Sequence, residues 1–277
     1  MEKIDSHQHF WRYSPERHDW IDDEMKEIRR HFLPADIEPL LKANGFTGCV
    51  AVQADQTMEE TMFLIDLARQ HRFICGVVGW VDLMRPNLED ELDILQEYDL
   101  LKGVRHILQS EPDDALMLKP AFKRGISILA GYNLTYDILV FPRHLKYVDE
   151  FVSMFPDQPF VIDHLAKPYI KSGDIQGWKK DMEIISKFPN LMCKISGMVT
   201  EADWKNWKQK DFTPFLDVAL ESFGAGRLMF GSDWPVCLVA AEYPEVVDIT
   251  ANYLKALSGA EQSAIFGGNA KAFYKLI

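Results

Sequence analysis

Short apolar segments recur along the chain at intervals that leave room for a helix between each pair. Most of them are continuous strings rich in Val, Ile and Leu rather than alternating patterns. Such strings are typical of strands covered by helices on both faces, which favours parallel pairing. The pattern predicts eight strands, over residues 3–9, 48–54, 73–82, 102–108, 133–140, 159–164, 191–196 and 227–233.

The segments between these strands carry helix signals. Thr57 and Glu60 match a capping box, in which a hydroxyl and a carboxylate satisfy backbone N–H groups at a helix start. Ser258 and Glu261 repeat this pattern near the end of the chain. A stripe of apolar residues at helical spacing consists of Leu145, Val148, Val152 and Phe155. Eight alternations of strand and helix predict an α/β fold, a closed (β/α)8 TIM barrel that forms a single domain over residues 1–277.

Three segments are longer than the repeat requires. Residues 10–34 follow the first strand, and residues 167–177 and 198–211 follow the sixth and seventh strands. Active sites of such barrels are built from the loops at the carboxyl ends of the strands. We therefore expect these three segments to form a rim or lid.

Composition and charge exclude several classes of protein. With 47% apolar and 26% charged residues the chain has ordinary globular proportions. A formal net charge of −12 repels phosphate backbones, so no nucleic-acid partner is expected. The four cysteines form no C-x-x-C pair. The first residues lack the apolar stretch that is typical of a signal peptide, and no apolar run of about 18 residues follows. We expect a cytoplasmic protein without a membrane partner; the sequence is compatible with a homo-oligomer.

Several predicted strands end in side chains that can do chemistry. In a parallel barrel all these ends lie at one mouth, so we expect the side chains to converge there. The residues concerned are His7, His9, Asp82, Arg105, His106, His164 and Asp233.

The pair His7 and His9 and the single Asp233 are the strongest candidates for catalysis. Two residues apart on a strand, both imidazoles face the barrel interior, where they can bind a metal or donate hydrogen bonds to one substrate oxygen. Asp233 follows an apolar strand, and a carboxylate in a water-restricted pocket can act as a general base. Both features also have a purely structural interpretation. For Asp233, that interpretation is an aspartate that begins a turn before Pro235.

Other polar and aromatic residues are candidates for substrate binding. Arg105 can anchor a negative or polyhydroxylated ligand, or it can seal the end of the barrel. His106 is its neighbour on the strand and faces the opposite side. Aromatic faces beside such groups suit a sugar-like ring, although each indole can equally be packing. The tryptophans that follow or flank strand ends are Trp11, Trp20, Trp80 and Trp234.

Five ordered strings carry a family resemblance over essentially the whole chain: IDSHQHFW, VVGWVDL, LKGVRHIL, FVIDHLAKP and MFGSDWPV. They resemble the amidohydrolase superfamily, in particular its amidohydrolase-related family 2 branch of L-rhamnono- and L-fucono-lactonases and 2-pyrone-4,6-dicarboxylate lactonase. The resemblance implies a barrel that opens a lactone by adding water at the ester carbonyl. By motif, His7, His9, His164 and Asp233 match the family's site residues.

The fifth strand departs from the family pattern. Metal-dependent members supply a His or a carboxylated Lys there, whereas this strand offers Tyr136 and Asp137. We therefore expect activity that is largely independent of metal; the alternative is one zinc ion bound by His7, His9 and Asp233.

The resulting hypothesis is a hydrolase that opens a sugar-derived lactone. Asp233 would activate water, and His7, His9 and His164 would stabilise the oxyanion. The predicted substrate-binding residues are Arg105, His106, Trp80, Asp82, Trp11 and Trp234. Three alternatives stay open on the same barrel: a metal-dependent amidohydrolase or decarboxylase, a 2-pyrone-4,6-dicarboxylate lactonase, and a carbohydrate-binding protein without catalytic activity.

Overall fold

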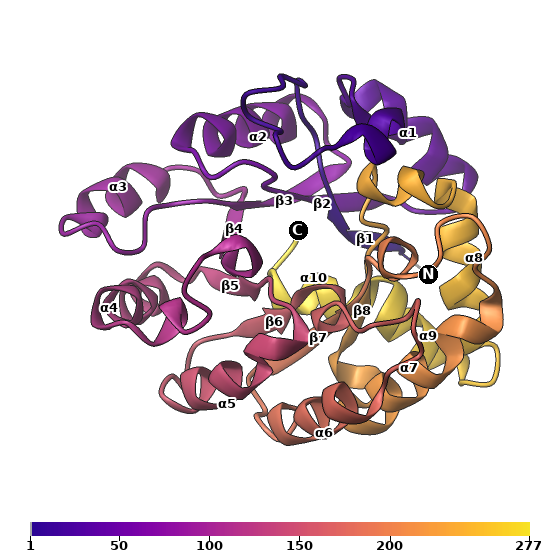
Figure 1. Cartoon of the computed structure of the whole chain (residues 1–277). Coiled ribbons are helices and arrows are strands. Elements are labelled where there is room, and N and C mark those ends of the chain that lie inside the picture. Colours follow the sequence, from indigo (N-terminus) through magenta and orange to yellow (C-terminus); the bar gives the residue numbers. More distant parts are fainter. Residues whose placement is uncertain (1) are drawn as a thin grey trace.

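The continuous apolar segments form eight parallel strands in the computed structural model, which describes residues 2–277 (Figure 1). The strands pair in sequence order from first to last, which confirms the predicted (β/α)8 barrel. Their bounds are β1 Ile4–Gln8, β2 Gly48–Val52, β3 Ile74–Gly79, β4 Leu101–His106, β5 Thr135–Ile138, β6 Phe160–Ile162, β7 Leu191–Ile195 and β8 Leu228–Phe230.

The barrel closes where the last strand meets the first. Beyond the end of β8, the backbone N–H of Asp233 donates to the carbonyl of His7 at 2.8 Å. The N–H of His9 in turn donates to the carbonyl of Trp234 at 2.7 Å. We call this junction, residues 7–9 with residues 233–234, the closing seam. It lies at the carboxyl ends of the strands, where barrel enzymes place their sites.

Helices surround the strands and cover the outer face of the sheet (Figure 1). A large apolar cluster fills the space between the two layers, as two-sided burial of the strands requires. The helices are α1 Pro34–Ala43, α2 Met58–Gln70, α3 Leu88–Leu95, α4 Pro120–Leu129, α5 Leu145–Ser153, α6 Gln176–Ile185, α7 Gln209–Phe223, α8 Tyr243–Leu254, α9 Gly259–Ser263 and α10 Asn269–Phe273.

The two predicted capping boxes behave differently. At α9, Ser258 and Glu261 form the complete reciprocal pair. At α2, Thr57 accepts from the N–H of Glu60, as predicted. The Glu60 carboxylate instead reaches past the cap to the backbone N–H groups of Ala54 and Asp55, because those donors follow β2 and have no partner in a strand. Glu60 thereby ties the loop after β2 to α2.

A smaller apolar cluster fills the end of the barrel interior opposite the seam. It combines side chains from the strands, such as Ile4, Val50 and Met229, with Tyr274 from the chain's end. Figure 1 shows the yellow C-terminal segment at the middle of the ring of strands. Within residues 2–277, none of the helices has both the length and the apolar character that crossing a bilayer requires.

Candidate active site

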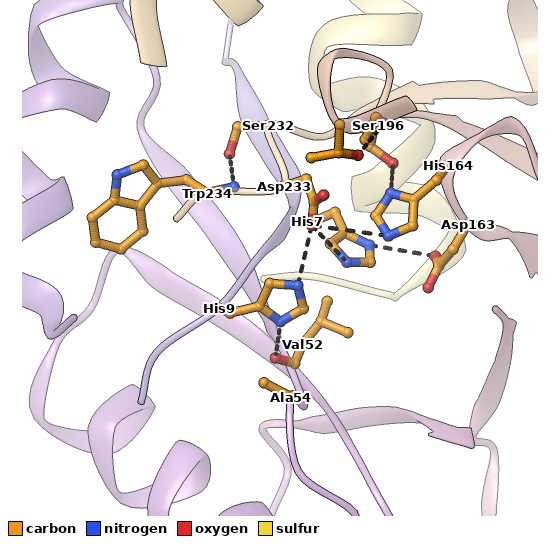
Figure 2. A network of polar contacts seen from close by, with 12 residues as sticks. His7, His9, Val52, Ala54, Asp163, His164, Ser196, Ser232, Asp233 and Trp234 are labelled. Carbon is orange, nitrogen blue, oxygen red and sulfur yellow. Dashed lines mark hydrogen bonds and ion pairs between the residues drawn. The ribbon is translucent and has the colours of Figure 1, made fainter. Parts of the chain in front are cut away.

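The carboxylate of Asp233 stands among three imidazoles at the closing seam (Figure 2). Its Oδ1 atom lies 3.2 Å from Nε2 of His9. The Nε2 atoms of His7 and His164 each lie 3.9 Å from the same oxygen. Asp233 has a left-handed backbone with φ of 57°. For a residue other than glycine this conformation is costly, and it recurs at functional sites where the surroundings hold it in place.

His9 is oriented by a backbone carbonyl. Its Nδ1 lies 2.7 Å from the carbonyl oxygen of Val52, which can only accept, so Nδ1 carries a proton. Its other ring nitrogen, Nε2, faces Asp233 Oδ1 at 3.2 Å, so the ring bridges the end of β2 and the carboxylate.

His164 projects from an unusual turn after β6. Four consecutive residues, from His164 to Lys167, have positive φ values between 52° and 56°. The His164 Nδ1 lies 2.9 Å from the hydroxyl oxygen of Ser196. Gly197 packs against the imidazole so closely that a Cβ there would come within 2.5 Å of Nδ1. The loop after β7 therefore requires glycine to hold His164 in place.

His7 is fully buried below these groups and is enclosed by charged side chains. Its Nδ1 lies 3.2 Å from Nζ of Lys194 and 3.4 Å from a carboxylate oxygen of Asp163. Its Nε2 lies 3.3 Å from Nη1 of Arg105. Both edges of the ring are thus held by partners inside the barrel.

A network of buried charges supports His7 from beneath. Lys194 on β7 bonds Asp137 on β5 at 2.5 Å and Asp163 at 3.0 Å, and all three side chains are inaccessible to solvent. Arg105 on β4 bonds the other oxygen of Asp163 at 3.0 Å. The hydroxyl of Tyr274 donates to Asp137 at 2.7 Å. Inside the barrel each charge has an opposite partner, which offsets the cost of its burial.

This environment keeps the imidazoles of His7 and His164 neutral and the carboxylate of Asp233 ionised. Burial holds the pKa values of His7 and His164 well below the ordinary value for histidine. Burial alone would raise the pKa of Asp233, but the neighbouring His164 and His9 outweigh it and lower that pKa. At neutral pH, Asp233 is therefore an ionised base in a buried site.

A pocket of about 410 Å³ opens above this cluster. The predicted residues His9, Arg105, His164 and Asp233 line it, which brings side chains of four strands to one mouth. All three long segments contribute to its wall, as expected for a rim. Their contributions are Arg17, Asp19, Trp20 and Met25 from the first segment and Lys167, Thr200, Glu201 and Trp204 from the other two.

Arg105 borders the pocket, but its guanidinium is engaged within the barrel. Nε and Nη2 both donate to Gln53, and Nη1 faces Asp163 and His7. The side chain is only 3% exposed. This geometry corresponds to the sealing alternative considered for Arg105, because its donors already have partners.

The other predicted substrate-binding residues lie outside the pocket lining. Trp80 donates from Nε1 to His106, whose Nε2 lies 2.7 Å from a carboxylate oxygen of Glu111. Asp82 accepts from the N–H of Met84 in a turn. The role of these three residues in substrate binding stays a prediction.

Two of the predicted tryptophans are packed into the structure. Trp11 is buried and donates to the carbonyl of Arg30, while its ring stands edge-on to Trp20. Trp234 packs against Phe10 and Phe32, and Figure 2 shows its indole turned away from the histidines. The indoles that line the pocket are instead Trp20 and Trp204.

Comparison with known proteins decides the family. The model of the family described as amidohydrolase matches residues 4–276. The chain belongs to the amidohydrolase family. It is 39% identical to an L-fucono-1,5-lactonase of Burkholderia multivorans, over 99% of this chain and 96% of that protein. It is 35% identical to an L-fucono-1,5-lactonase of Burkholderia ambifaria, with the same coverage. A crystal structure of a Burkholderia multivorans amidohydrolase with bound zinc matches with a TM-score of 0.96 and 39% identity over the whole of both chains.

The donor set of this amidohydrolase suits a divalent metal. Ligand atoms of His7, His164 and Asp233 all lie within 4.8 Å of one another, and imidazole and carboxylate are zinc ligands. The predicted trio contained His9 in place of His164. The Nε2 atoms of His7 and His164 each lie 3.9 Å from Asp233 Oδ1, and His9 Nε2 lies 3.2 Å from the same oxygen, so the predicted trio stays a prediction.

Sequence reasoning missed several residues of the amidohydrolase site. Lys194 and Asp163 are charged residues within strongly apolar predicted strands. Because a buried charge requires a partner of opposite charge, these two positions could have predicted an ion pair inside the barrel. Glu201 and Trp204 had no comparable signal. Glu201 ends a 3-10 helix of three residues, Val199–Glu201, and Trp204 follows it; this segment is too short for a periodic pattern to assign a side chain to one face.

Proposed function

We propose that this amidohydrolase hydrolyses a sugar-derived lactone, such as L-fucono-1,5-lactone or an L-rhamnonolactone, to the open hydroxy acid. The observation that carries the proposal is the ionised Asp233 among three imidazoles at the floor of a pocket. The full-length similarity to two L-fucono-1,5-lactonases supports the substrate class. A single catalytic domain over residues 1–277 is part of this proposal.

Asp233 is the general base in the proposed reaction. His9 occupies its Oδ1, while Oδ2 forms no hydrogen bond within residues 2–277 and can accept a proton from water. The water oxygen bonds to the lactone carbonyl carbon as Asp233 takes that proton. When the ring C–O bond breaks, the same proton passes to the departing ring oxygen, so the product is a carboxylic acid with a new hydroxyl group.

His164 is the proposed donor to the oxyanion. If the hydroxyl of Ser196 donates to Nδ1, the neutral ring carries its proton on Nε2, which faces Asp233 and borders the pocket. A fixed donor in a buried site stabilises the charge that develops on the former carbonyl oxygen. His7 contributes by holding this cluster in place rather than by contacting the substrate.

We further propose that turnover does not require a metal. A zinc ion held by His7, His164 and Asp233 would polarise the carbonyl and lower the pKa of water when bound. The guanidinium of Arg105, however, lies 3.3 Å from Nε2 of His7 and can donate to the lone pair that a metal would need. Lys194 adds a second positive charge at the other edge of the ring.

A panel of lactones tests the proposed function. Wild-type protein is assayed by acid release with L-fucono-1,5-lactone, L-rhamnono-1,4-lactone, 2-pyrone-4,6-dicarboxylate and an unsubstituted lactone, beside the variant Asp233→Asn. We expect the highest kcat/KM with a sugar lactone, and a loss of about 10²-fold or more in the variant, whose amide cannot accept the proton. Preference for the dicarboxylate would overturn the substrate class, and near-wild-type turnover by the folded variant would overturn the role of Asp233.

A further inference from the structure

Two charged side chains in the pocket wall have no role in the mechanism described above. Lys167 is the last residue of the left-handed turn after β6, and its N–H donates to the carbonyl of His164 at 2.7 Å. Glu201 lies in the loop after β7. The N–H of Lys171 donates to the carbonyl of Glu201 at 2.9 Å and joins the two loops. The fold therefore holds both residues on one side of the pocket.

The two side chains face each other but do not satisfy each other's hydrogen-bonding capacity. Nζ of Lys167 lies 3.8 Å from Oε1 of Glu201, which is an ion-pair distance but too long for a hydrogen bond. Within residues 2–277, neither charged group forms a hydrogen bond to another partner. Their side chains are 18% and 20% exposed. Both groups thus retain hydrogen-bonding capacity in a partly dehydrated position, which is unfavourable until a ligand supplies the partners.

The pair is close enough to the reacting groups to contact the same ligand. Both residues line the pocket together with His164 and Asp233. The charge of Lys167 also acts on Asp233 and helps to lower its pKa. Trp204 lines the same pocket and is held by a hydrogen bond from its Nε1 to the carbonyl of Thr200 at 2.8 Å. The wall thus offers one donor, one acceptor and an apolar ring face.

The balance of charge identifies the kind of ligand group. An isolated lysine would attract a carboxylate, but Glu201 cancels that preference and would repel an anion. A sugar hydroxyl both donates and accepts, so two neighbouring hydroxyls can satisfy an ammonium and a carboxylate at once. Uncharged polyols therefore fit this wall better than a dicarboxylate does.

We propose that Lys167 and Glu201 form a subsite for two neighbouring hydroxyl groups of the lactone ring, the ammonium donating to one and the carboxylate accepting from the other. This inference rests on the proposed sugar lactonase function and specifies which part of the substrate the pocket recognises. The pair is a specificity determinant, and the chemistry at the carbonyl belongs to Asp233 and His164.

The test combines protein variants with substrates that lack one hydroxyl. We would measure kcat/KM of wild type, Lys167→Met and Glu201→Gln on L-fucono-1,5-lactone and on its singly deoxygenated analogues. Hydrogen bonds to charged groups are strong enough that each variant should lose about 10-fold or more on the parent lactone. On the analogue that lacks the contacted hydroxyl, the same variant should differ from wild type by less than about 3-fold. The two hydroxyls identified in this way should be neighbours on the ring.

The matched control is Lys171→Met, a lysine of the same loop that does not line this pocket. It should leave kcat/KM unchanged on every substrate. Thermal unfolding within about 2 °C of wild type shows that each variant is folded; Lys167→Gln and Glu201→Ala replace any that is not. Equal losses on the parent and on all analogues would mean that the pair only tunes the electrostatics of Asp233, and would overturn the subsite. A wild type inactive on all lactones would instead overturn the proposed function.

Discussion

Replacement of Lys194 by methionine should destabilise the protein strongly, although the residue does not line the pocket. Methionine preserves most of the side chain's packing but removes the charge that bonds Asp137 at 2.5 Å. Asp163 keeps Arg105 as a partner, whereas Asp137 keeps only the hydroxyl of Tyr274. Breaking a buried ion pair by removing one partner costs about 3–5 kcal/mol.

The corresponding change in melting temperature follows from the size of the chain. An unfolding entropy of about 2.1 cal/mol/K per residue gives about 0.6 kcal/mol/K for 277 residues. The expected loss is therefore about 5–9 °C at pH 8, measured by thermal unfolding followed by far-UV circular dichroism. The deficit should narrow at pH 5, where the unpaired Asp137 can take up a proton in the folded state.

Two further variants test whether the loss of stability comes from the unpaired carboxylate of Asp137. Lys271→Met removes an exposed lysine that bonds Glu2 at 2.8 Å, and it should shift Tm by no more than about 1 °C, because exposed ion pairs contribute little. The double variant Lys194→Met/Asp137→Asn removes the unpaired charge and should recover more than half of the lost stability. If Lys194→Met were as stable as Lys271→Met, or if the double variant were no better than the single one, the argument from a buried unpaired carboxylate would be wrong.

Two other predictions concern pH and metal. Burial raises the pKa of Glu60 to about 8 in the folded protein, from about 4.5 in the unfolded chain. The contribution of protonated Glu60 to the free energy of unfolding is therefore complete below pH 4.5 and is lost as the pH rises through 8. The Tm of Glu60→Gln relative to wild type should therefore increase between pH 5 and pH 8, by on the order of 5 °C; a pH-independent difference would contradict this. After treatment with a chelator, protein shown to be metal-free by elemental analysis should keep most of its lactonase activity, because Arg105 already bonds His7. Loss of activity that zinc alone restores would establish the metal-dependent alternative.

The sequence was sufficient to predict the strands, since continuous apolar strings have few other uses in a chain of this composition. The strand ends were less accurate, for a physical reason that the seam illustrates. The predicted strand over residues 227–233 ends at Phe230 in the structure, because the following residues leave the sheet and Asp233 turns into the left-handed region. The apolar character of the residues therefore predicts that a strand is present but not the residue at which the backbone leaves the sheet.

The residues of the candidate site were predictable where a reactive side chain follows directly on an apolar strand. His7, His9, His164 and Asp233 were all identified in this way, and the structure places them together. The indoles were harder, because an aromatic residue after a strand can face the pocket or the core. Trp234 packs among phenylalanines, whereas Trp204, on an irregular loop, reaches the pocket. Only the path of the loop backbone decides between these outcomes.

The closing seam also has a consequence for folding kinetics. It joins residues 7–9 to residues 233–234, which are more than 220 positions apart along the chain, and it carries the proposed general base on one side and two imidazoles on the other. Contacts between such distant segments form late, after local helices and neighbouring strands. During refolding, catalytic activity should therefore return after the helical signal has recovered, so that turnover of a lactone reports the moment at which the first and last strands meet.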